Sequence, residues 1–412
     1  MQIDTQASTV SQAESDALAA HRQRGLFFLG AACAAAGCTM ALQMGLNSNF
    51  VAQEMGLSGQ QQGYLEAFRE SCGILALGVL ALLTWLAEPL IAAAMLVLLG
   101  IGLGSYSYVR DLPWLIVASL VWSQGLHVWM PLPNSMTLAL AEPGRAGYRL
   151  GQMQAAGNIG SGVGLALALT LVLSGAASIR PLYLVAGGAA VVAGMACLGI
   201  PRAMKADRPR LVFRWRYRLY YLLCLLEGWR KQICIAFAGF LLVQKYKTEL
   251  WVMLSLAILI QILGWFIAPR VGRWIDRVGE QRALVFYYAS LTVFFVCYAM
   301  LESRYLLWAL FIIDNVFFVF TMALTTYVNR IAPREEHTPT LSMGVAMNHI
   351  ASVAMPLIGG MLWTRFGYQW AFLTGVGTAA LSIVVALRLP SAPSTVPSEP
   401  ALKPPAIVPA DE

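Results

Sequence analysis

The sequence predicts an all-α membrane protein with twelve transmembrane helices in two pseudo-symmetric six-helix bundles. Three observations predict it: 58% of the 412 residues are hydrophobic, only 12% are charged, and charge-free stretches such as residues 366–387 recur along the chain. A soluble chain would carry about 25% charged residues. A bilayer core of about 30 Å requires roughly 20 apolar residues in a helix, and the alternating pattern of a membrane barrel is absent.

Hydropathy divides the chain into twelve candidate spans. They lie at residues 25–47, 62–86, 88–108, 114–139, 150–174, 181–201, 219–243, 251–271, 283–302, 305–329, 341–363 and 370–390. Proline marks several joints because it can begin a helix but interrupts its interior; these prolines are Pro89, Pro113, Pro143 and Pro181. An even number of spans places both termini on one side of the membrane.

The longest interruption follows the sixth span and carries seven basic residues against one acid. It predicts five parts: a cytoplasmic N-terminal tail (1–24), an N-terminal six-helix bundle (25–201), a basic cytoplasmic linker (202–218), a C-terminal six-helix bundle (219–390) and a disordered Pro-rich tail (391–412). A shift of 191 residues aligns the halves at Leu150, Ala155, Ile159 and Ser161 with Leu341, Ala346, Ile350 and Ser352. Two related halves with a site between them are typical of transporters.

Positive charge in short loops predicts the orientation. With a cytoplasmic N-terminus, the inside segments hold 19 Lys and Arg, the outside loops hold six, and three lie within spans. The net charge of +7 therefore reflects membrane topology, and we expect no nucleic-acid partner. We expect a multi-pass protein of the plasma (bacterial inner) membrane, monomeric, with both termini cytoplasmic.

Cofactor and enzyme signatures are absent from the sequence. The seven cysteines lie in apolar spans without CxxC or Cys/His metal-ligand spacing, so they are interpreted as small buried hydrophobes. No Gly-rich phosphate-binding run precedes a Lys-Ser/Thr pair. We therefore expect no metal, no cofactor, no enzymatic activity and no direct use of ATP. The polar first 24 residues lack the pattern of a cleaved signal peptide.

The most specific motif follows the eighth span and includes Gly272, Asp276, Arg277 and Gly279. It resembles the Gly-x-x-x-Asp-Arg-x-Gly-Arg-Lys signature of the major facilitator superfamily, and the resemblance covers essentially residues 25–390. It implies a fold of that kind and a secondary transporter. In that family the glycine permits close helix approach, and the Asp and Arg hold one gate shut through charge-assisted contacts.

This chain departs from the family pattern in two places. Glu280 and Gln281 stand where basic residues are usual, and the equivalent first-half turn, which begins at Gly78, lacks the Asp and Arg. A matching first-half latch is therefore not expected. The alternative for Asp276 and Arg277 is an ordinary solvated loop.

Ionisable residues within the spans are the main functional candidates: Glu66, Arg69, Glu70, His127, Glu227, Arg230, Lys231, Asp314 and His349. Each ionised group in lipid costs roughly 2.5–3.5 kcal/mol on insertion scales. They must therefore face one another or water. Glu66 and Glu227 each precede basic residues at helical spacing, so intrahelical ion pairs explain part of the set. Asp314 has no such neighbour, and the resemblance implies that its helix lines the central cavity.

We hypothesise that Arg230, Lys231 and Arg69 give a midplane cavity positive potential, while Glu227 and Asp314 exchange a proton. A carboxylate that meets Arg in one state and is buried unpaired in another changes protonation. Glu70 and His349 are further candidates for substrate binding or coupling. Alternatively, His349 makes an interhelical hydrogen bond, and His127 is accommodated in a helix made irregular by two nearby prolines, Pro131 and Pro133.

Three weaker patterns remain. Gly157, Gly160, Gly162 and Gly164 on the fifth span predict close helix packing, and similar glycines occur in drug-exporting members of the family. Met40/Met44 and Met343/Met347 resemble pairs in copper-importing members, but gap filling is the favoured interpretation. Gln43, Asn158 and Asn348 line a cavity or bond between helices.

The leading functional hypothesis is a transporter of a small organic solute, anionic or zwitterionic, coupled to a proton or another ion. An alternative is an efflux antiporter for drugs or metabolites. An alternative of another class is a non-transporting sensor or assembly factor with the same fold. The sequence leaves the direction of transport open.

Overall fold

The computed structural model describes residues 2–390 except positions 84, 143, 203 and 205–211, and for residues 2–18, 334, 335 and 338 it describes only the backbone. The predicted tail 391–412 and much of the linker 202–218 therefore lie outside the described residues. The elements are α1 (Gln2–Asn49), η1 (Phe50–Glu54), α2 (Gly59–Leu82), α3 (Glu88–Ser105), α4 (Leu112–Trp129), α5 (Leu132–Leu140), α6 (Ala146–Leu173), α7 (Ile179–Cys197), η2 (Trp215–Tyr217), α8 (Arg218–Gln232), η3 (Ile233–Ala238), α9 (Gly239–Gln244), α10 (Leu250–Val278), α11 (Glu280–Met300), α12 (Arg304–Phe317), η4 (Phe318–Thr321), α13 (Met322–Ile331), α14 (Arg334–Phe366) and α15 (Tyr368–Leu387).

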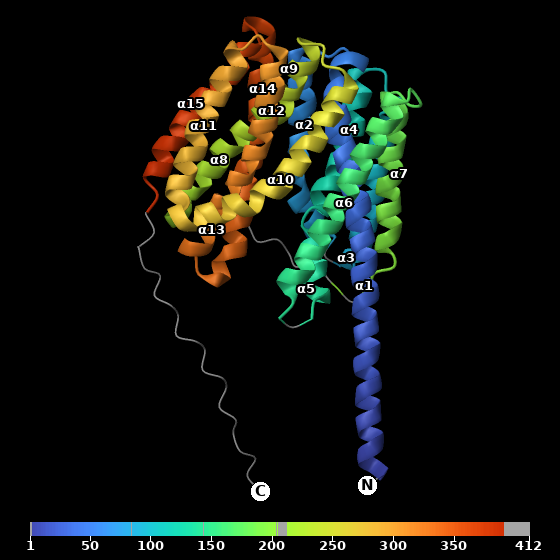
Figure 1. The fold of residues 1–412 in the computed structure, drawn as a ribbon. Helices are drawn as coiled ribbons and strands as arrows, with labels where there is room; N and C mark the ends of the chain where they lie inside the picture. Colours follow the sequence, from blue (N-terminus) through green and yellow to red (C-terminus); the bar gives the residue numbers. More distant parts are fainter. Residues whose placement is uncertain (1, 84, 143, 203, 205–211, 391–412) are drawn as a thin grey trace.

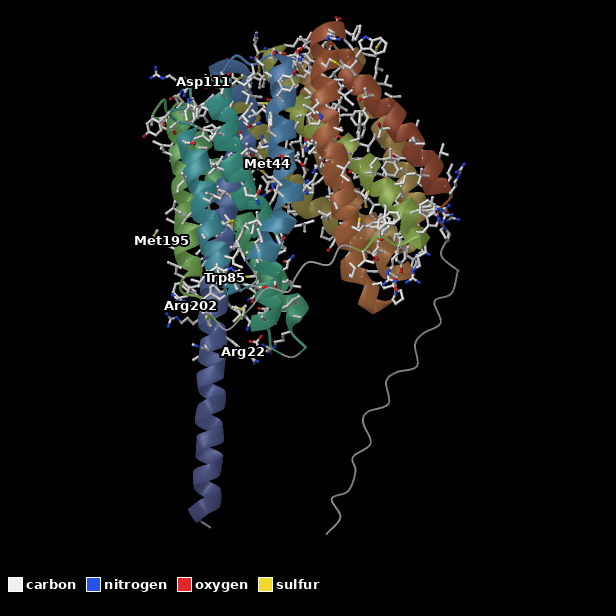
Figure 2. All side chains as sticks on the ribbon, turned by 180° about the vertical axis from the view of Figure 1, so that it is seen from behind. Arg22, Met44, Trp85, Asp111, Met195 and Arg202 are labelled. Atoms are coloured by element: carbon white, nitrogen blue, oxygen red, sulfur yellow. The ribbon has the colours of Figure 1, made fainter. Side chains whose placement is uncertain are left out.

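The helices run side by side in a bundle of two halves (Figure 1). Most of α1–α7 lies on one side of the view and most of α8–α15 on the other. We call the end where α1 enters the bundle and α15 ends the terminal face, and the other end the opposite face. Arg22 and Arg202 lie near the terminal face and Asp111 at the opposite face (Figure 2).

The predicted all-α, twelve-span fold is confirmed. Ten of the described helical segments are long and apolar enough to cross a membrane by composition alone. The other two predicted spans, 62–86 and 219–243, form α2 and the run α8–η3–α9. Those two helical runs carry most of the ionisable residues predicted within the spans, which lowers their hydropathy.

Three helices differ from the predicted ranges. The first continues back to Gln2 rather than beginning at 25, because no Gly or Pro interrupts residues 2–24. The fourth is broken between Trp129 and Leu132, where prolines remove backbone donors; the expected irregularity near His127 is thus confirmed. The tenth contains a tighter turn, η4, between α12 and α13.

Two spans contain π-helical segments, η1 in the first and η3 in the seventh. A π-helical turn inserts one residue into the α-helical ladder and often occurs at functional sites. η3 begins three residues after Arg230 and includes Cys234. It therefore changes the direction of side chains next to the charged part of the seventh span.

The two halves contact each other on the opposite face. Asn49 Nδ2 donates to the carbonyl of Thr248 at 2.9 Å, and Gln244 Nε2 donates to the carbonyl of Leu57 at 3.2 Å. One apolar cluster of the first half also includes Phe240 and Leu254 of the second. In contrast, the apolar cluster at the terminal end of the first half contains only first-half residues among those described. The halves are thus closed together at the opposite face.

Close packing of α1 against α6 depends on glycine. A Cβ at Gly160 would collide with the backbone of Ala34, and one at Gly164 would lie 2.7 Å from Cys38 Sγ. At Gly157 an added Cβ would reach Cys33 O at an ordinary 3.6 Å, whereas at Gly162 it would meet open space. Gly160 and Gly164 therefore face α1, and Gly162 faces away.

The described end of the linker is fastened to the start of α14. Glu336 accepts a 2.7 Å hydrogen bond from Tyr217 Oη and pairs with Arg214 at 3.1 Å and with Arg216. Hydrogen bonds from Tyr217 and Arg216 hold the pKa of the Glu336 carboxyl below its usual value. This cluster ties the segment that enters α8 to the terminal end of the eleventh span.

Gly160→Ala should lower the free energy of unfolding by about 1–3 kcal/mol because the methyl group forces α1 and α6 apart. Gly162→Ala is the matched control and should leave stability unchanged. Thermal unfolding of the two purified variants in detergent checks this. Equal melting temperatures would contradict the packing role of Gly160.

Glu336→Gln should lower the melting temperature at neutral pH and have little effect in acid. The folded-state pKa of Glu336 lies below its unfolded value of about 4.3. Its contribution to stability is therefore present above that pH and is lost as the pH falls through the folded-state pKa. Melting curves from pH 3 to 7, with exposed Glu302→Gln as control, measure it; a pH-independent difference would contradict it.

Candidate functional site

Ionisable side chains gather in three groups midway along the spans. One lies inside the second half, one inside the first half, and one joins the halves. Some of the charged partners lie three residues apart on the same helix, and the others come from different spans that pack together.

The second-half group consists of Glu227 and Arg230 on α8 and Asp314 on α12. Glu227 Oε1 accepts from Arg230 Nη2 at 2.6 Å and from Arg230 Nε at 3.0 Å. Arg230 Nη1 lies 3.9 Å from Asp314 Oδ1, which makes a long ion pair without a hydrogen bond. All three residues are buried, Asp314 completely. One guanidinium thus stands between two carboxylates.

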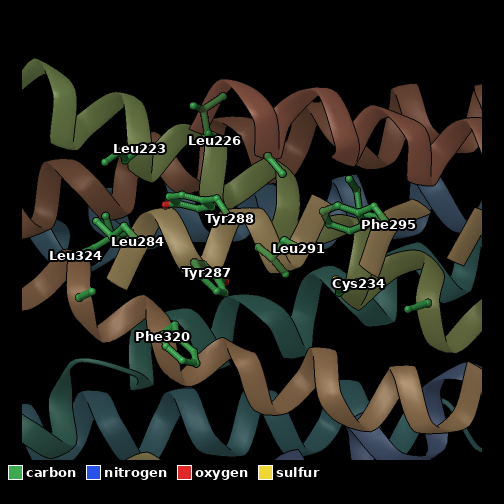
Figure 3. Packing of buried hydrophobic residues seen from close by; sticks show 14 of the residues in the cluster. Leu223, Leu226, Cys234, Leu284, Tyr287, Tyr288, Leu291, Phe295, Phe320 and Leu324 are labelled. Atoms are coloured by element: carbon green, nitrogen blue, oxygen red, sulfur yellow. The ribbon is translucent and has the colours of Figure 1, made fainter. Parts of the chain in front are cut away.

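Aromatic residues enclose this group. Tyr287 Oη donates to Glu227 Oε1 at 3.1 Å, and Tyr298 Oη donates to Asp314 Oδ2 at 3.4 Å. The guanidinium of Arg230 lies 3.9 Å from the centroid of the Phe318 ring, a cation–π contact. Tyr287 also stacks on Phe320 within the packed second-half core (Figure 3). The charges are therefore separated from lipid by tyrosine and phenylalanine side chains.

The first-half group is the ion pair of Glu66 and Arg69 on α2. Arg69 Nη1 lies 2.9 Å from Glu66 Oε1, and its guanidinium lies 5.0 Å from the centroid of the Trp122 ring. Gln62 Nε2 donates both to Glu66 Oε1 and to the carbonyl of Ala236 in the second half. The spacing of three residues that predicted an intrahelical pair is realised here.

The third group joins the halves through Glu70 on α2. Its Oε2 lies 3.5 Å from Lys231 Nζ on α8 and 3.2 Å from His349 Nδ1 on α14. The ring centroids of His349 and His127 on α4 are 5.1 Å apart. One ligand atom from each of Glu70, His127 and His349 lies within 4.8 Å of the others, so these three residues could hold a metal ion. Glu70 thus pairs across the interface rather than with Arg69.

A cavity of about 250 Å³ lies between the halves. Its polar lining comes from α1, α2 and α6 on one side and from α10 and α12 on the other; these residues are Gln43, Asn47, Ser48, Arg69, Ser161, Gln261 and Asn315. Met40, Met44 and Cys234 add apolar and sulfur surface. The cavity therefore offers hydrogen-bond donors and one cation within a mostly apolar wall.

The predicted site residues divide between the cavity and the layer behind it. Arg69 lines the cavity, whereas Glu227, Arg230 and Asp314 are absent from its lining. Cys234 bridges the two: it lines the cavity and accepts a contact from Arg230 Nη1 at 3.8 Å. Of the three basic residues predicted to give the cavity positive potential, Arg69 therefore lines it, Arg230 lies one side chain behind its wall, and Lys231 lies outside its lining beside Glu70.

The motif after the eighth span lies at the terminal face. Asp276 and Arg277 are exposed, and neither forms an ion pair with a residue whose side chain the structure describes. Gly279 has φ +84° and separates α10 from α11. At Gly272 an added Cβ would come only within 3.6 Å of Met322 Sδ. Glu280, the departure from the family pattern, pairs with Arg330 at 3.1 Å.

Sequence reasoning missed several members of the site. Tyr287 and Tyr298 carry the carboxylate hydrogen bonds, and Cys234 connects the charged group with the cavity. The signal for the tyrosines was their position in an apolar span, because a buried tyrosine hydroxyl usually finds a partner. Of the weaker candidates, Gln43 lines the cavity, Asn348 bonds the carbonyl of Cys224, and Asn158 accepts from Gln154.

The sequence matches the family model of the Major Facilitator Superfamily over residues 27–337 and 251–410. No curated protein matches the sequence. A variant of the nucleoside transporter NupG is similar in structure, with 13% identity, a TM-score of 0.73 and coverage of 88% of this chain and 98% of that one. A bacterial homologue of the human lysosomal transporter Spinster, inward-facing and unoccupied, has 12% identity, a TM-score of 0.70 and coverage of 89% and 96%. At these identities the likeness shows the fold.

Arg230→Met should destabilise the protein by about 3–5 kcal/mol because it leaves buried carboxylates without a counter-charge. The triple variant Arg230→Met, Glu227→Gln, Asp314→Asn should recover most of that loss. Exposed Arg277→Met is the control and should change stability by less than about 0.5 kcal/mol. Unfolding in detergent, followed by fluorescence, measures all three; a stable Arg230→Met single variant would refute the pairing.

Proposed function

Because the chain belongs to the major facilitator superfamily of membrane transporters, we propose that it is a proton-coupled secondary transporter that moves a small organic solute by alternating access. The observation that carries the coupling is the charge balance around Arg230. Two carboxylates, Glu227 and Asp314, share this one guanidinium in a buried group.

Full ionisation would leave one negative charge uncompensated in that group. Such a charge costs several kcal/mol in a dry interior, so the group carries one proton. Asp314 is the proposed proton carrier because its distance to the guanidinium, 3.9 Å, exceeds the 2.6 Å of Glu227. Its Oδ1 also accepts no hydrogen bond from the side chains described.

Coupling follows if Arg230 changes partner during transport. When the guanidinium moves toward Asp314, the proton passes from that carboxylate to Glu227, which has lost its counter-charge. When the guanidinium returns to Glu227, the proton returns to Asp314, so the group keeps one proton throughout. The cavity lies one side chain away, behind Cys234, and Asn315 next to Asp314 lines it. Solute in the cavity can therefore bias which partner Arg230 selects.

The cavity supports a small solute with an anionic or acceptor group. Its volume of about 250 Å³ is below the usual 300–1,000 Å³ of sites for drug-sized ligands. Arg69 supplies the cation, and its pairing with Glu66 leaves room for a weakly bound anion or a zwitterion. A small metabolite fits these properties better than a bulky drug does.

The orientation proposed from loop charge places the terminal face in the cytoplasm. The chain would then be a multi-pass, monomeric protein of the plasma (bacterial inner) membrane with both termini inside. Closure at the opposite face and separate apolar clusters at the terminal face would correspond to an inward-open state.

Asp314→Asn should abolish accumulation driven by the proton gradient while the protein stays folded, because the amide keeps the shape but carries no titratable proton. Uptake of a panel of radiolabelled small organic acids and zwitterions by expressing cells, with and without a protonophore, measures it. Asp111→Asn, which keeps the exposed helix cap of α4, is the control. Gradient-driven uptake by Asp314→Asn at the wild-type rate would remove Asp314 from the mechanism.

A further inference from the structure

Two of the four histidines in the sequence lie together in the middle of the bundle. His127 belongs to α4 in the first half and His349 to α14 in the second, and their ring centroids are 5.1 Å apart. Glu70 on α2 completes a group whose ligand atoms lie within 4.8 Å of one another. Three helices from both halves therefore bring two imidazoles and a carboxylate to one point.

The His127 ring is oriented as a metal-binding imidazole usually is. Its Nδ1 lies 2.8 Å from the carbonyl oxygen of Ser123. A carbonyl only accepts hydrogen bonds, so Nδ1 carries the proton and Nε2 keeps its lone pair. Metal-bound histidines commonly donate their second N–H to a backbone carbonyl in this way.

The ring of His349, in the second half, lies in a space that is open because Gly73 of the first half has no side chain. A Cβ at Gly73 on α2 would collide with three atoms of the His349 ring. The ring also lies 3.2 Å, through Nδ1, from Glu70 Oε2 and is 12% exposed. The imidazole is therefore held between the halves but is not fully enclosed by protein.

We propose that Glu70, His127 and His349 bind a divalent transition-metal ion of the zinc class between the two halves. Two imidazoles and a carboxylate are a ligand set that Zn²⁺ accepts, with an open position for water or another ligand. Ligands far apart in the sequence meet only where the halves close. The ion therefore stabilises this conformation, since a ligand shifts the equilibrium toward the state it binds.

Lys231 occupies the cation position in the absence of metal. Its Nζ lies 3.5 Å from Glu70 Oε2, and the side chain is 21% exposed. A flexible lysine stem lets the ammonium swing away when a metal ion arrives. Lys231 and the metal ion thus compete for the same carboxylate. Removal of the Lys231 side chain should therefore strengthen metal binding, whereas removal of a metal ligand should weaken it.

The experiment uses the full chain in detergent, stripped with EDTA and without a polyhistidine tag. Titration with Zn²⁺ in a calorimeter should give one ion per chain, and Co²⁺ should give the visible absorption of a four-coordinate site. Glu70→Gln, His127→Gln and His349→Gln should each weaken Zn²⁺ binding at least about ten-fold. His337→Gln, near the terminal face, is the matched control and should bind as the wild type does.

Lys231→Ala should bind Zn²⁺ several-fold more tightly than the wild type. Zn²⁺ should also raise the melting temperature of the wild type and of Lys231→Ala, but not of His349→Gln. These variants keep or reduce side-chain volume, and size-exclusion profiles identify any that misfold. Absence of binding, or stoichiometric binding that survives both His127→Gln and His349→Gln, would overturn the proposal. Neither result depends on Asp314 or on solute uptake.

Discussion

Charge compensation inside a membrane is the constraint on which the arrangement of this protein depends. An ionised side chain cannot be left facing lipid, so every charged residue within the spans needs a partner within reach. α2 and α8 carry most of these residues, and neither is among the ten described segments that are long and apolar enough by composition to cross a membrane. Within the bundle Arg69, Arg230 and Lys231 each meet a carboxylate. The large exposed side chains of α2, such as Phe68, Ile74 and Leu75, are apolar.

The same constraint has different solutions in the three groups. Glu66 and Arg69 neutralise each other within one helix, so their pairing survives any rigid movement of the halves. Glu70 depends on Lys231 and His349 of the second half, so its contacts exist only while the halves are close. Arg230 has more carboxylate around it than it can neutralise. Of the three groups, only the one around Arg230 contains surplus charge, and only the one around Glu70 depends on the distance between the halves.

Much of the fold follows from local sequence. Hydropathy locates twelve spans because each apolar helix must be long enough to cross the bilayer core. The three-residue spacing of Glu66 to Arg69 and of Glu227 to Arg230 predicts the two intrahelical pairs. Pro131 and Pro133 indicate the break after α4. The partners of Glu70 and the meeting of His127 with His349 could not be predicted in this way. They depend on the packing of α2 against α14 and α4, which no local pattern encodes. The π-helical turn η3, which positions Cys234, left no signal in the sequence either.

The positions of the groups also constrain how a cycle can work. Glu227, Arg230 and Asp314 belong to one half and move together when the halves rock, so rocking by itself does not separate them. A change of partner by Arg230 must therefore come from a local rearrangement, and η3 is placed to provide it because Cys234 lies between the guanidinium and the cavity. Glu70 has the complementary property, since rocking breaks its contacts without any local change. In the proposed cycle the group around Arg230 responds to what occupies the cavity, and the group around Glu70 sets the stability of the closed opposite face. Asp276 and Arg277 are exposed at the terminal face and form no ion pair with a described side chain in this conformation, in which the halves are closed at the other face.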